Sequence, residues 1–286
     1  MGPIETIRFA DGGTAPRMGQ GTWQMGDDPA CRARELEALR RGIDLGLTLL
    51  DTAEMYGQGA SEQLVGQAIQ GYDRSRLFLV SKVCPQNAGP GDLQAHCRAS
   101  LRRLGTDYLD LYLLHWRGAV PLDQVVQGMQ DLVQRGLIRR WGVSNFEVSD
   151  MEELLALPGG ASCAANQLMY HLGSRGVEFD LLPWLRRHHM PLMAYCPLAR
   201  AGCLRSELLQ DPTVRAVAQA HGASPMQVLL AFLMAVPGVL CIPKAAQAAH
   251  VQANRAAADL RLTPAELDAL DRRFPAPDHY TEIDML

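Results

Sequence analysis

The sequence lacks the features of several protein classes. None of its 7 cysteines forms a CxxC pair or another spacing typical of a metal site, so neither a disulfide framework nor a bound metal is expected. No apolar run is long enough to cross a membrane, and the N-terminal segment has no apolar secretion-signal core. These absences favour a protein of the reducing cytoplasm with no membrane partner.

A strong charge of one sign is also missing. The formal net charge is -4 over 286 residues, and the arginine pairs are scattered instead of gathered in one basic stretch. We therefore expect no nucleic-acid partner. With 48% hydrophobic residues, the chain can bury a large core, and we expect a single domain over residues 1–286. The tail after residue 274 is expected to be its most frayed part.

What the chain does contain is a regular alternation of short apolar runs and helical stretches. Segments with apolar residues three and four apart resemble crossover helices, most clearly Ala33 to Leu45, Leu122 to Arg135 and Pro225 to Ala235. The pattern predicts an α/β fold, a (β/α)8 TIM barrel with a short N-terminal β-ribbon near Ile4 to Phe9. The eight predicted strands are Met18 to Gly21, Thr48 to Asp51, Leu77 to Lys82, Leu109 to His115, Ile138 to Ser144, Ala164 to Gln167, Pro191 to Tyr195 and Val239 to Ile242.

A Rossmann sheet is the competing arrangement for such a pattern. Its glycine fingerprint is incomplete here, because Gly19-Gln20-Gly21 lacks the third glycine and the acidic residue expected about 20 residues further on. We interpret the two glycines as a close backbone turn.

Four polar side chains stand at or just past the ends of predicted strands: Asp51, Tyr56, Lys82 and His115. Each has a structural explanation by itself: a helix cap, a core tyrosine, a salt-bridged lysine and a satisfied buried histidine. In a barrel, however, the carboxyl ends of all strands share the face that carries the active site. Their joint placement favours catalysis.

These four side chains suit the protonation of a carbonyl oxygen. A tyrosine has a pKa of about 10 and needs a neighbour that favours its phenolate if it is to donate a proton near neutral pH. Lys82 could provide the charge, Asp51 could hold Lys82, and His115 could hydrogen-bond the substrate oxygen. No side chain donates a hydride, so a nicotinamide cofactor is implied.

The motifs around these residues resemble those of the aldo-keto reductase superfamily in order and spacing. They are LTLLDTAEMYG, LVSKV, LDLYLLHW, RRWGVSNF, NQLMYH, MAYCPLA and CIPKA, and the similarity is closest to the short bacterial members described as methylglyoxal reductases. The resemblance implies that Tyr56 is the proton donor, Lys82 and Asp51 the pair that lowers its pKa, and His115 the residue that orients the substrate.

The same resemblance implies a cofactor site and a substrate site. Ser144, Asn145 and Gln167 match residues that bind the nicotinamide carboxamide, and Tyr195 matches the ring that stacks on it. Further cofactor contacts fall on the segment from Cys196 to Leu198 for the pyrophosphate, on Lys244 for the 2'-phosphate, and on His250 and Asn254 near the adenosine; Trp23 and Trp116 match the aromatic wall around the substrate.

The adenosine end departs from the family pattern. Many members that use NADPH have serine, arginine and glutamate where this chain has Ala245, His250 and Ala253. A neutral imidazole does not replace a bidentate guanidinium, although Arg255 could compensate from a neighbouring position. We expect NADPH as the cofactor because Lys244 is present, with NADH possible.

The resulting hypothesis is a monomeric, NADPH-dependent reductase of small methylglyoxal-like aldehydes or ketones. Sugar-derived keto compounds are the alternative substrates. Two other functions stay open at this point: an aldolase-type enzyme in which Lys82 forms a Schiff base, and a nucleotide-sensing barrel without catalysis, like the potassium-channel β-subunits that resemble this superfamily.

Overall fold

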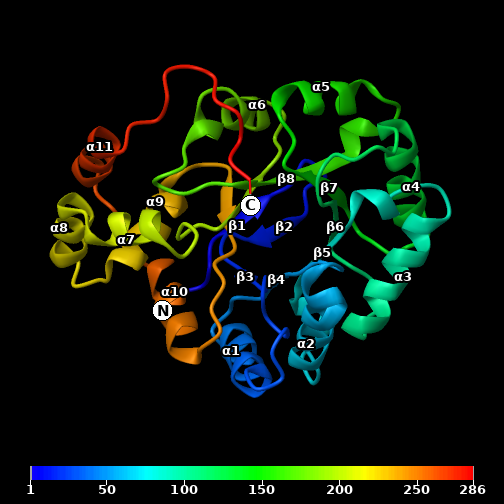
Figure 1. Ribbon diagram of the computed structural model, residues 1–286, viewed down its shortest axis with the longest axis horizontal. Helices are drawn as coiled ribbons and strands as arrows, with labels where there is room; N and C mark the ends of the chain where they lie inside the picture. Colours follow the sequence, from blue (N-terminus) through cyan, green and yellow to red (C-terminus); the bar gives the residue numbers. More distant parts are fainter. Residues whose placement is uncertain (1, 286) are drawn as a thin grey trace.

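The computed structural model describes residues 2–285; Met1 and Leu286, the ends of the predicted domain, lie outside the described residues. Eight parallel strands form a ring with helices outside it, as Figure 1 shows. The predicted (β/α)8 barrel is confirmed, and every predicted strand is present within a few residues. In chain order, which is also their order around the ring, the strands are β3 (Gln20–Gly21), β4 (Leu49–Asp51), β5 (Phe78–Val83), β6 (Leu111–Leu114), β7 (Trp141–Ser144), β8 (Cys163–Met169), β9 (Leu192–Tyr195) and β10 (Val239–Cys241).

The barrel closes between its first and last strands. Two isolated parallel bridges, Met18 with Cys241 and Gly21 with Lys244, join β3 to β10. A Cβ atom on Gly21 would lie 2.7 Å from the backbone oxygen of Ile242, a separation at which atoms clash. The glycines therefore permit close approach of two strands, and our interpretation of them as a turn was wrong.

Successive side chains of each strand alternate between two apolar clusters. One cluster fills the barrel lumen and includes Leu49, Val80, Leu113 and Met193. The other lies between the strands and the surrounding helices and includes neighbours such as Leu50 and Tyr112. Because successive residues of a strand point to opposite faces, a position two residues after a lumen residue also faces the lumen.

A hairpin covers the amino-terminal end of the barrel. It consists of β1 (Thr6–Arg8) and β2 (Thr14–Pro16), which pair in antiparallel fashion. Phe9 stacks on Phe78 at the start of β5, with ring centroids 5.8 Å apart. This confirms the predicted ribbon and leaves the opposite end of the barrel for the active site.

The surrounding helices begin and end close to the predicted positions. The helix predicted over Pro225 to Ala235 has those bounds, with Ser224 and Gln227 forming a capping box before it. No helix within residues 2–285 has the length and apolar character needed to span a membrane. The helices are α1 (Arg32–Asp44), α2 (Ala60–Ala68), α3 (Asp92–Leu104), α4 (Leu122–Gln134), α5 (Val148–Ala156), α6 (Leu181–Arg187), α7 (Cys203–Gln210), α8 (Pro212–Ala220), α9 (Pro225–Ala235), α10 (Ala248–Ala257) and α11 (Pro264–Arg273).

The C-terminal tail is anchored, contrary to the expectation that it frays. It returns from α11 toward the middle of the view in Figure 1. The backbone N–H of Ile283 donates to Oε1 of Glu147, 2.8 Å away, and Ser174 donates to Asp284. Both partners follow barrel strands, so the tail packs over the carboxyl-terminal end of the barrel.

Candidate active site

Seven polar residues of the candidate site continue the inward-facing rows of the barrel lumen. Each lies two positions after a residue that faces the lumen, at the carboxyl end of its strand, where the apolar filling stops. The pairs are Leu49 and Asp51, Val80 and Lys82, Leu113 and His115, Gly142 and Ser144, Ala165 and Gln167, Met193 and Tyr195, and Ile242 and Lys244.

Asp51, Lys82 and Tyr56 form a line of hydrogen bonds. The Nζ atom of the fully buried Lys82 lies 2.7 Å from Oδ2 of Asp51 and donates to the Tyr56 hydroxyl 3.2 Å away. Its third donor bonds the backbone oxygen of Thr52 at 2.9 Å. All three N–H donors of the Lys82 ammonium are therefore engaged, which holds the charged group beside the Tyr56 hydroxyl.

Nearby charges and burial have opposing effects on the pKa values of Lys82 and Tyr56. Burial would lower the pKa of Lys82, but Asp51 and Tyr56 raise it above its ordinary value, so Lys82 stays protonated. Burial raises the pKa of Tyr56, and the opposing effect of Lys82 only partly offsets this. The expected net lowering of the Tyr56 pKa was therefore wrong, and the phenol is protonated at neutral pH.

His115 lies edge-on to Tyr56, with ring centroids 5.7 Å apart. Burial and the nearby Lys82 charge lower the pKa of His115 to about 3. Its Nδ1 atom is buried and has no hydrogen-bond partner among residues 2–285, which further disfavours a second ring proton. A neutral imidazole can still hydrogen-bond a ligand oxygen.

A second set of polar side chains adjoins this line across the barrel. Ser144 donates to the backbone oxygen of Gln167 at 2.9 Å, and the Asn145 amide lies 3.2 Å from the Ser144 hydroxyl. The Tyr195 hydroxyl donates to Oδ1 of Asn145 at 3.0 Å. The Gln167 amide donates to Oδ1 of Asp51 at 2.8 Å, which joins the two sets.

Left-handed backbone marks the same rim of the barrel. Asn145, immediately after β7, has φ 58°, and Cys196, immediately after β9, has φ 49°. A cysteine is costly in this conformation and an asparagine less so, and such residues concentrate at functional sites because the surrounding structure must hold them. Both stand at positions predicted to contact the cofactor.

The segment after β9 is held by an arginine from α7. Arg205 donates to the backbone oxygens of Leu198 and Ala199. The turn from Cys196 to Ala199 is closed by a backbone hydrogen bond of 2.8 Å. The segment predicted for the pyrophosphate thus has a fixed backbone.

The residues predicted for the adenosine end lie beyond β10, apart from the hydrogen-bonded sets. Lys244 and His250 are exposed, and Asn254 is buried on α10. Arg255 is buried and bonds the backbone oxygens of Leu45 and Gly2 and the carboxylate of Asp259. The idea that Arg255 compensates for His250 was therefore wrong.

The predicted aromatic wall lies at the mouth of the barrel. Trp116 packs against His115, with ring centroids 5.0 Å apart, and is 37% exposed. Trp23 follows β3, and the Arg200 guanidinium lies 6.0 Å from its ring centroid. Met55, next to Tyr56, is 46% exposed. These large side chains leave accessible apolar surface beside the polar line.

Two features of the site were not predicted from the sequence. They are the Gln167 contact with Asp51 and a buried carboxylate, Glu54, between Asp51 and Tyr56 in the chain. The only sequence signal for Glu54 is an acidic residue inside an otherwise buried segment. Over residues 2–285, no group of three or more His, Cys, Asp or Glu is arranged to hold a metal ion.

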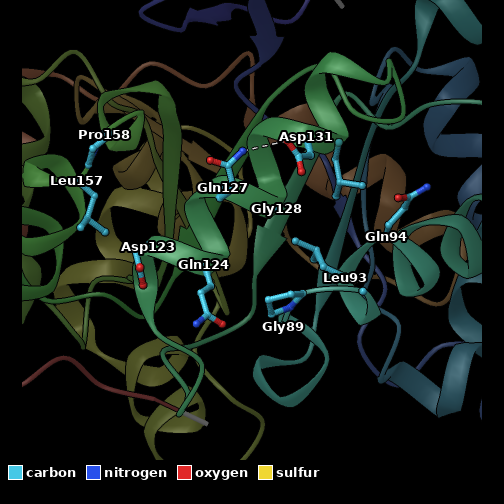
Figure 2. Close-up of a pocket in the computed structure, with 13 residues that line it drawn as sticks. Gly89, Leu93, Gln94, Asp123, Gln124, Gln127, Gly128, Asp131, Leu157 and Pro158 are labelled. Atoms are coloured by element: carbon cyan, nitrogen blue, oxygen red, sulfur yellow. Dashed lines mark hydrogen bonds between the residues drawn. The ribbon is translucent and has the colours of Figure 1, made fainter.

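A separate pocket of about 490 Å³ lies on the outer flank of the barrel between α3 and α4 (Figure 2). It is lined by Leu93, Gln94, Asp123 and Gln124, among others, and Gln127 there bonds its neighbour Asp131 at 3.0 Å. All residues predicted for the site lie elsewhere. We assign no chemistry to this pocket.

Comparisons with known proteins show the family to which this fold belongs. A model of the aldo/keto reductase family matches residues 17–273 of the chain. This protein belongs to the aldo/keto reductase family. It is similar to the methylglyoxal reductase YeaE of Escherichia coli, with 54% identity over 98% of both chains. It is also similar to methylglyoxal reductase DkgB of Salmonella typhi, with 31% identity over 90% of this chain and 92% of the relative.

Solved structures of other aldo/keto reductases have the same fold. One from Klebsiella pneumoniae, in complex with NADP and acetate, has 52% identity and a TM-score of 0.96, covering 99% of this chain and all of that chain. As a member of this family, the protein is an oxidoreductase enzyme.

Proposed function

We propose that this protein reduces small aldehydes or ketones, of the methylglyoxal-like 2-oxoaldehyde class, to alcohols with NADPH as cofactor and Tyr56 as proton donor. The observation that carries the proposal is the line from Asp51 through Lys82 to Tyr56, with the neutral His115 beside the phenol. The relatives named methylglyoxal reductases and the Klebsiella pneumoniae structure with NADP support the substrate class and the cofactor.

Tyr56 gives its hydroxyl proton to the carbonyl oxygen as the carbonyl carbon becomes the alcohol carbon. The phenol is protonated at neutral pH because burial raises its pKa. The phenolate left behind lies 3.2 Å from the Lys82 ammonium, whose charge Asp51 stabilises. Proton transfer of this kind contributes roughly 10² to 10⁴ in rate.

His115 fixes the position of the carbonyl oxygen by a hydrogen bond. Its pKa of about 3 keeps the ring neutral, so it adds no positive charge that would compete with Lys82 for the phenolate. Trp23, Trp116 and Met55 supply apolar contacts, which suit a small aldehyde.

The chain's donors and acceptors fit a nicotinamide cofactor. Ser144, Asn145 and Gln167 offer hydroxyl and amide groups at one place, and Tyr195 presents a ring beside them. When bound, NADPH supplies the hydride that the carbonyl carbon accepts. Further along, Cys196 and Leu198 would hold the pyrophosphate through their fixed backbone, and Lys244, His250 and Asn254 would hold the adenosine phosphate end.

NADPH is favoured over NADH by one exposed cation. Lys244 can pair with a phosphate dianion, whereas Ala245 and Ala253 offer no polar side chain. Because Arg255 is committed to backbone oxygens, the preference rests on Lys244.

The alternative functions fit the geometry less well. A Schiff-base lysine must lose its proton to attack a carbonyl, but Lys82 is fully buried against Asp51 and its pKa is raised. A nucleotide-sensing barrel without catalysis does not require the hydrogen bonds that join Asp51, Lys82 and Tyr56. Seven free cysteines support a reducing, cytoplasmic location. We also propose that the protein is a monomer.

The deciding experiment measures NADPH oxidation with methylglyoxal for the natural enzyme and for Tyr56→Phe, with NADH in parallel. We expect clear activity that prefers NADPH and falls by about 10² to 10⁴ in the variant. Cofactor binding by the variant, followed by fluorescence, should be unchanged. Equal inactivity of both proteins across a panel of small aldehydes, with cofactor binding intact, favours the sensing function.

A further inference from the structure

Glu54 is a buried carboxylate that the proposed reaction does not use. It lies between Asp51 and Tyr56 in the loop after β4, with 6% of its side chain exposed. Its Oε1 atom accepts from the backbone N–H of Cys84 and from the Asn87 amide, each at 2.8 Å. A buried carboxylate keeps its charge only with such partners.

The partners of the Glu54 side chain all follow Lys82 in the chain. Cys84 is two residues after Lys82, and Asn87 ends the short helix η3 (Pro85–Asn87). The Oε2 atom lies 2.7 Å from Nδ1 of the half-exposed His96 on α3. The backbone N–H of Glu54 also donates to the Lys82 oxygen at 3.2 Å. Glu54 therefore joins the loop that carries Tyr56 to the strand end that carries Lys82.

The turn that carries Tyr56 needs support of this kind. Within η1 (Tyr56–Gly59), Gly57 has φ 54°, Gln58 has φ 53° and Gly59 has φ 93°, so three successive residues are left-handed. Glutamine is unfavourable in that region. The turn's own backbone offers hydrogen bonds of 3.2 Å from Tyr56 to Ala53 and 3.1 Å from Gln58 to Met55.

We propose that Glu54 is a positioning residue that holds the Tyr56 turn against the Lys82 strand end and so sets the contact between the phenol and the ammonium. The proposal rests on the proposed role of Tyr56 as proton donor. Glu54 itself acts through these two residues.

Substitutions of Glu54 can separate the effect of its shape from the effect of its charge. A glutamine could accept from Cys84 and Asn87 with its amide oxygen and donate to Nδ1 of His96 in the tautomer whose ring proton lies on Nε2. An aspartate keeps the charge but is one methylene shorter and cannot reach all three partners. The positioning role therefore predicts that Glu54→Gln is tolerated and that Glu54→Asp and Glu54→Ala are not.

A matched control is available in Glu62. It is also fully buried, and it bonds the Ser81 hydroxyl and Arg103, both at 2.5 Å, on the outer side of β5. Glu62→Ala removes a buried carboxylate of similar connectivity and leaves all the contacts of Glu54 in place. It should lower the melting temperature without lowering kcat of the folded enzyme.

The first measurement compares kcat, KM for methylglyoxal and the Kd for NADPH among the Glu54 variants. We expect kcat to fall about 10- to 100-fold in Glu54→Asp and Glu54→Ala. The NADPH Kd should stay within about 3-fold of the natural value, and Glu54→Gln should keep kcat within about 3-fold. If Glu54→Ala does not fold, the contrast between Glu54→Asp and Glu54→Gln decides. Equal loss in those two variants, or no loss in either, overturns the proposal.

A second measurement does not depend on turnover. The Tyr56 phenol is titrated by near-ultraviolet absorbance, as the difference between each variant and its Tyr56→Phe double variant. Burial raises the phenol pKa, Lys82 lowers it, and Asp51 and Cys196 raise it further, while His115 is uncharged. We expect a higher Tyr56 pKa in Glu54→Asp than in the natural enzyme, because the two carry the same charge at residue 54 and differ in how the turn is held. If the natural enzyme is inactive, the proposed function fails, but the titration still shows whether Glu54 positions Tyr56. Identical Tyr56 pKa values in the compared proteins overturn the positioning role.

Discussion

Gln167 and Asp51 meet across the barrel lumen, where the side-chain amide nitrogen of Gln167 donates to Oδ1 of Asp51 at 2.8 Å. Their strands, β8 and β4, stand on opposite sides of the ring. An ionised carboxylate only accepts hydrogen bonds, so the Gln167 amide must present its nitrogen to Asp51 and its oxygen elsewhere. The other oxygen of Asp51 binds Lys82. A residue of the proposed cofactor set thus shares the carboxylate that orients the proposed proton donor.

This contact predicts an unusual pH dependence for Gln167→Glu. A second carboxylate beside Asp51 repels it when both are ionised, but at lower pH the new carboxyl is protonated and can donate as the amide did. We expect the activity deficit relative to the natural enzyme to be at least about 10-fold smaller at pH 5.5 than at pH 8. The measurement is kcat/KM against pH, with Gln167→Ala as control. A deficit that is the same at every pH in both variants contradicts the shared-carboxylate interpretation.

His250→Arg is expected to strengthen the preference for NADPH. His250 is exposed near Lys244 in the chain, and a guanidinium can make two parallel hydrogen bonds to a phosphate, which an imidazole cannot. An exposed pair of this kind gives about 2- to 5-fold tighter binding. Fluorescence titration with NADPH and NADH checks this, and the NADH affinity should be unchanged. An equal gain for both cofactors would place His250 away from the phosphate.

Arg255→Met is expected to affect stability and not cofactor choice. The buried guanidinium satisfies the backbone oxygens of Leu45 and Gly2 and pairs with Asp259. Its loss leaves buried acceptors unpaired and should reduce the free energy of unfolding by about 2 to 4 kcal/mol. Urea unfolding measures that change. The ratio of NADPH to NADH affinity should stay constant, and a changed ratio would restore Arg255 as a cofactor contact.

His171 is expected to make the fold less stable in mild acid. Its ring is 1% exposed, and burial is the main cause that lowers its pKa to about 4. The unfolded chain, with a pKa near 6.5, binds the proton more readily, so the free energy of unfolding falls as the pH drops below 6.5 and levels off near 4. Between pH 7 and pH 5 the loss from this residue is about 2 kcal/mol.

Comparison with His171→Asn isolates that contribution. The Asn oxygen can replace Nδ1, which accepts from the Gly173 N–H at 3.1 Å, but it does not titrate. Urea unfolding at pH 7 and pH 5 should show a smaller loss in the variant, while His115 contributes equally to both proteins. If the two losses are equal, His171 is not the group that titrates.

The strands and the rim of the site were predictable because both depend on local patterns. Apolar runs mark buried strands, and a polar residue two positions past a lumen residue must reach the carboxyl end of the barrel, as Asp51 and Lys82 do. The strand β3 is shorter than predicted, since its ladder contains only Gln20 and Gly21. The partner strand β2 (Thr14–Pro16) was not predicted, because Gly12, Gly13 and Pro16 in and beside it are typical of a loop.

Contacts between distant segments were not predictable in the same way. Glu54 finds partners in two later elements, and Arg255 bonds Gly2 from the other end of the chain. The tail was expected to fray because its sequence has no periodic pattern, yet Glu147 and Ser174 bind it. Such pairings depend on how the closed barrel brings loops together, and no local pattern encodes them.

The joint between β3 and β10 gives the barrel a seam. Seven neighbouring strand pairs in the ring share ladders, whereas this one rests on two single bridges. Lys244 stands on one side of the seam, and Gly21, two residues before Trp23, on the other. A cofactor held by Lys244 would bind beside this seam, and its binding free energy would then oppose separation of the first and last strands.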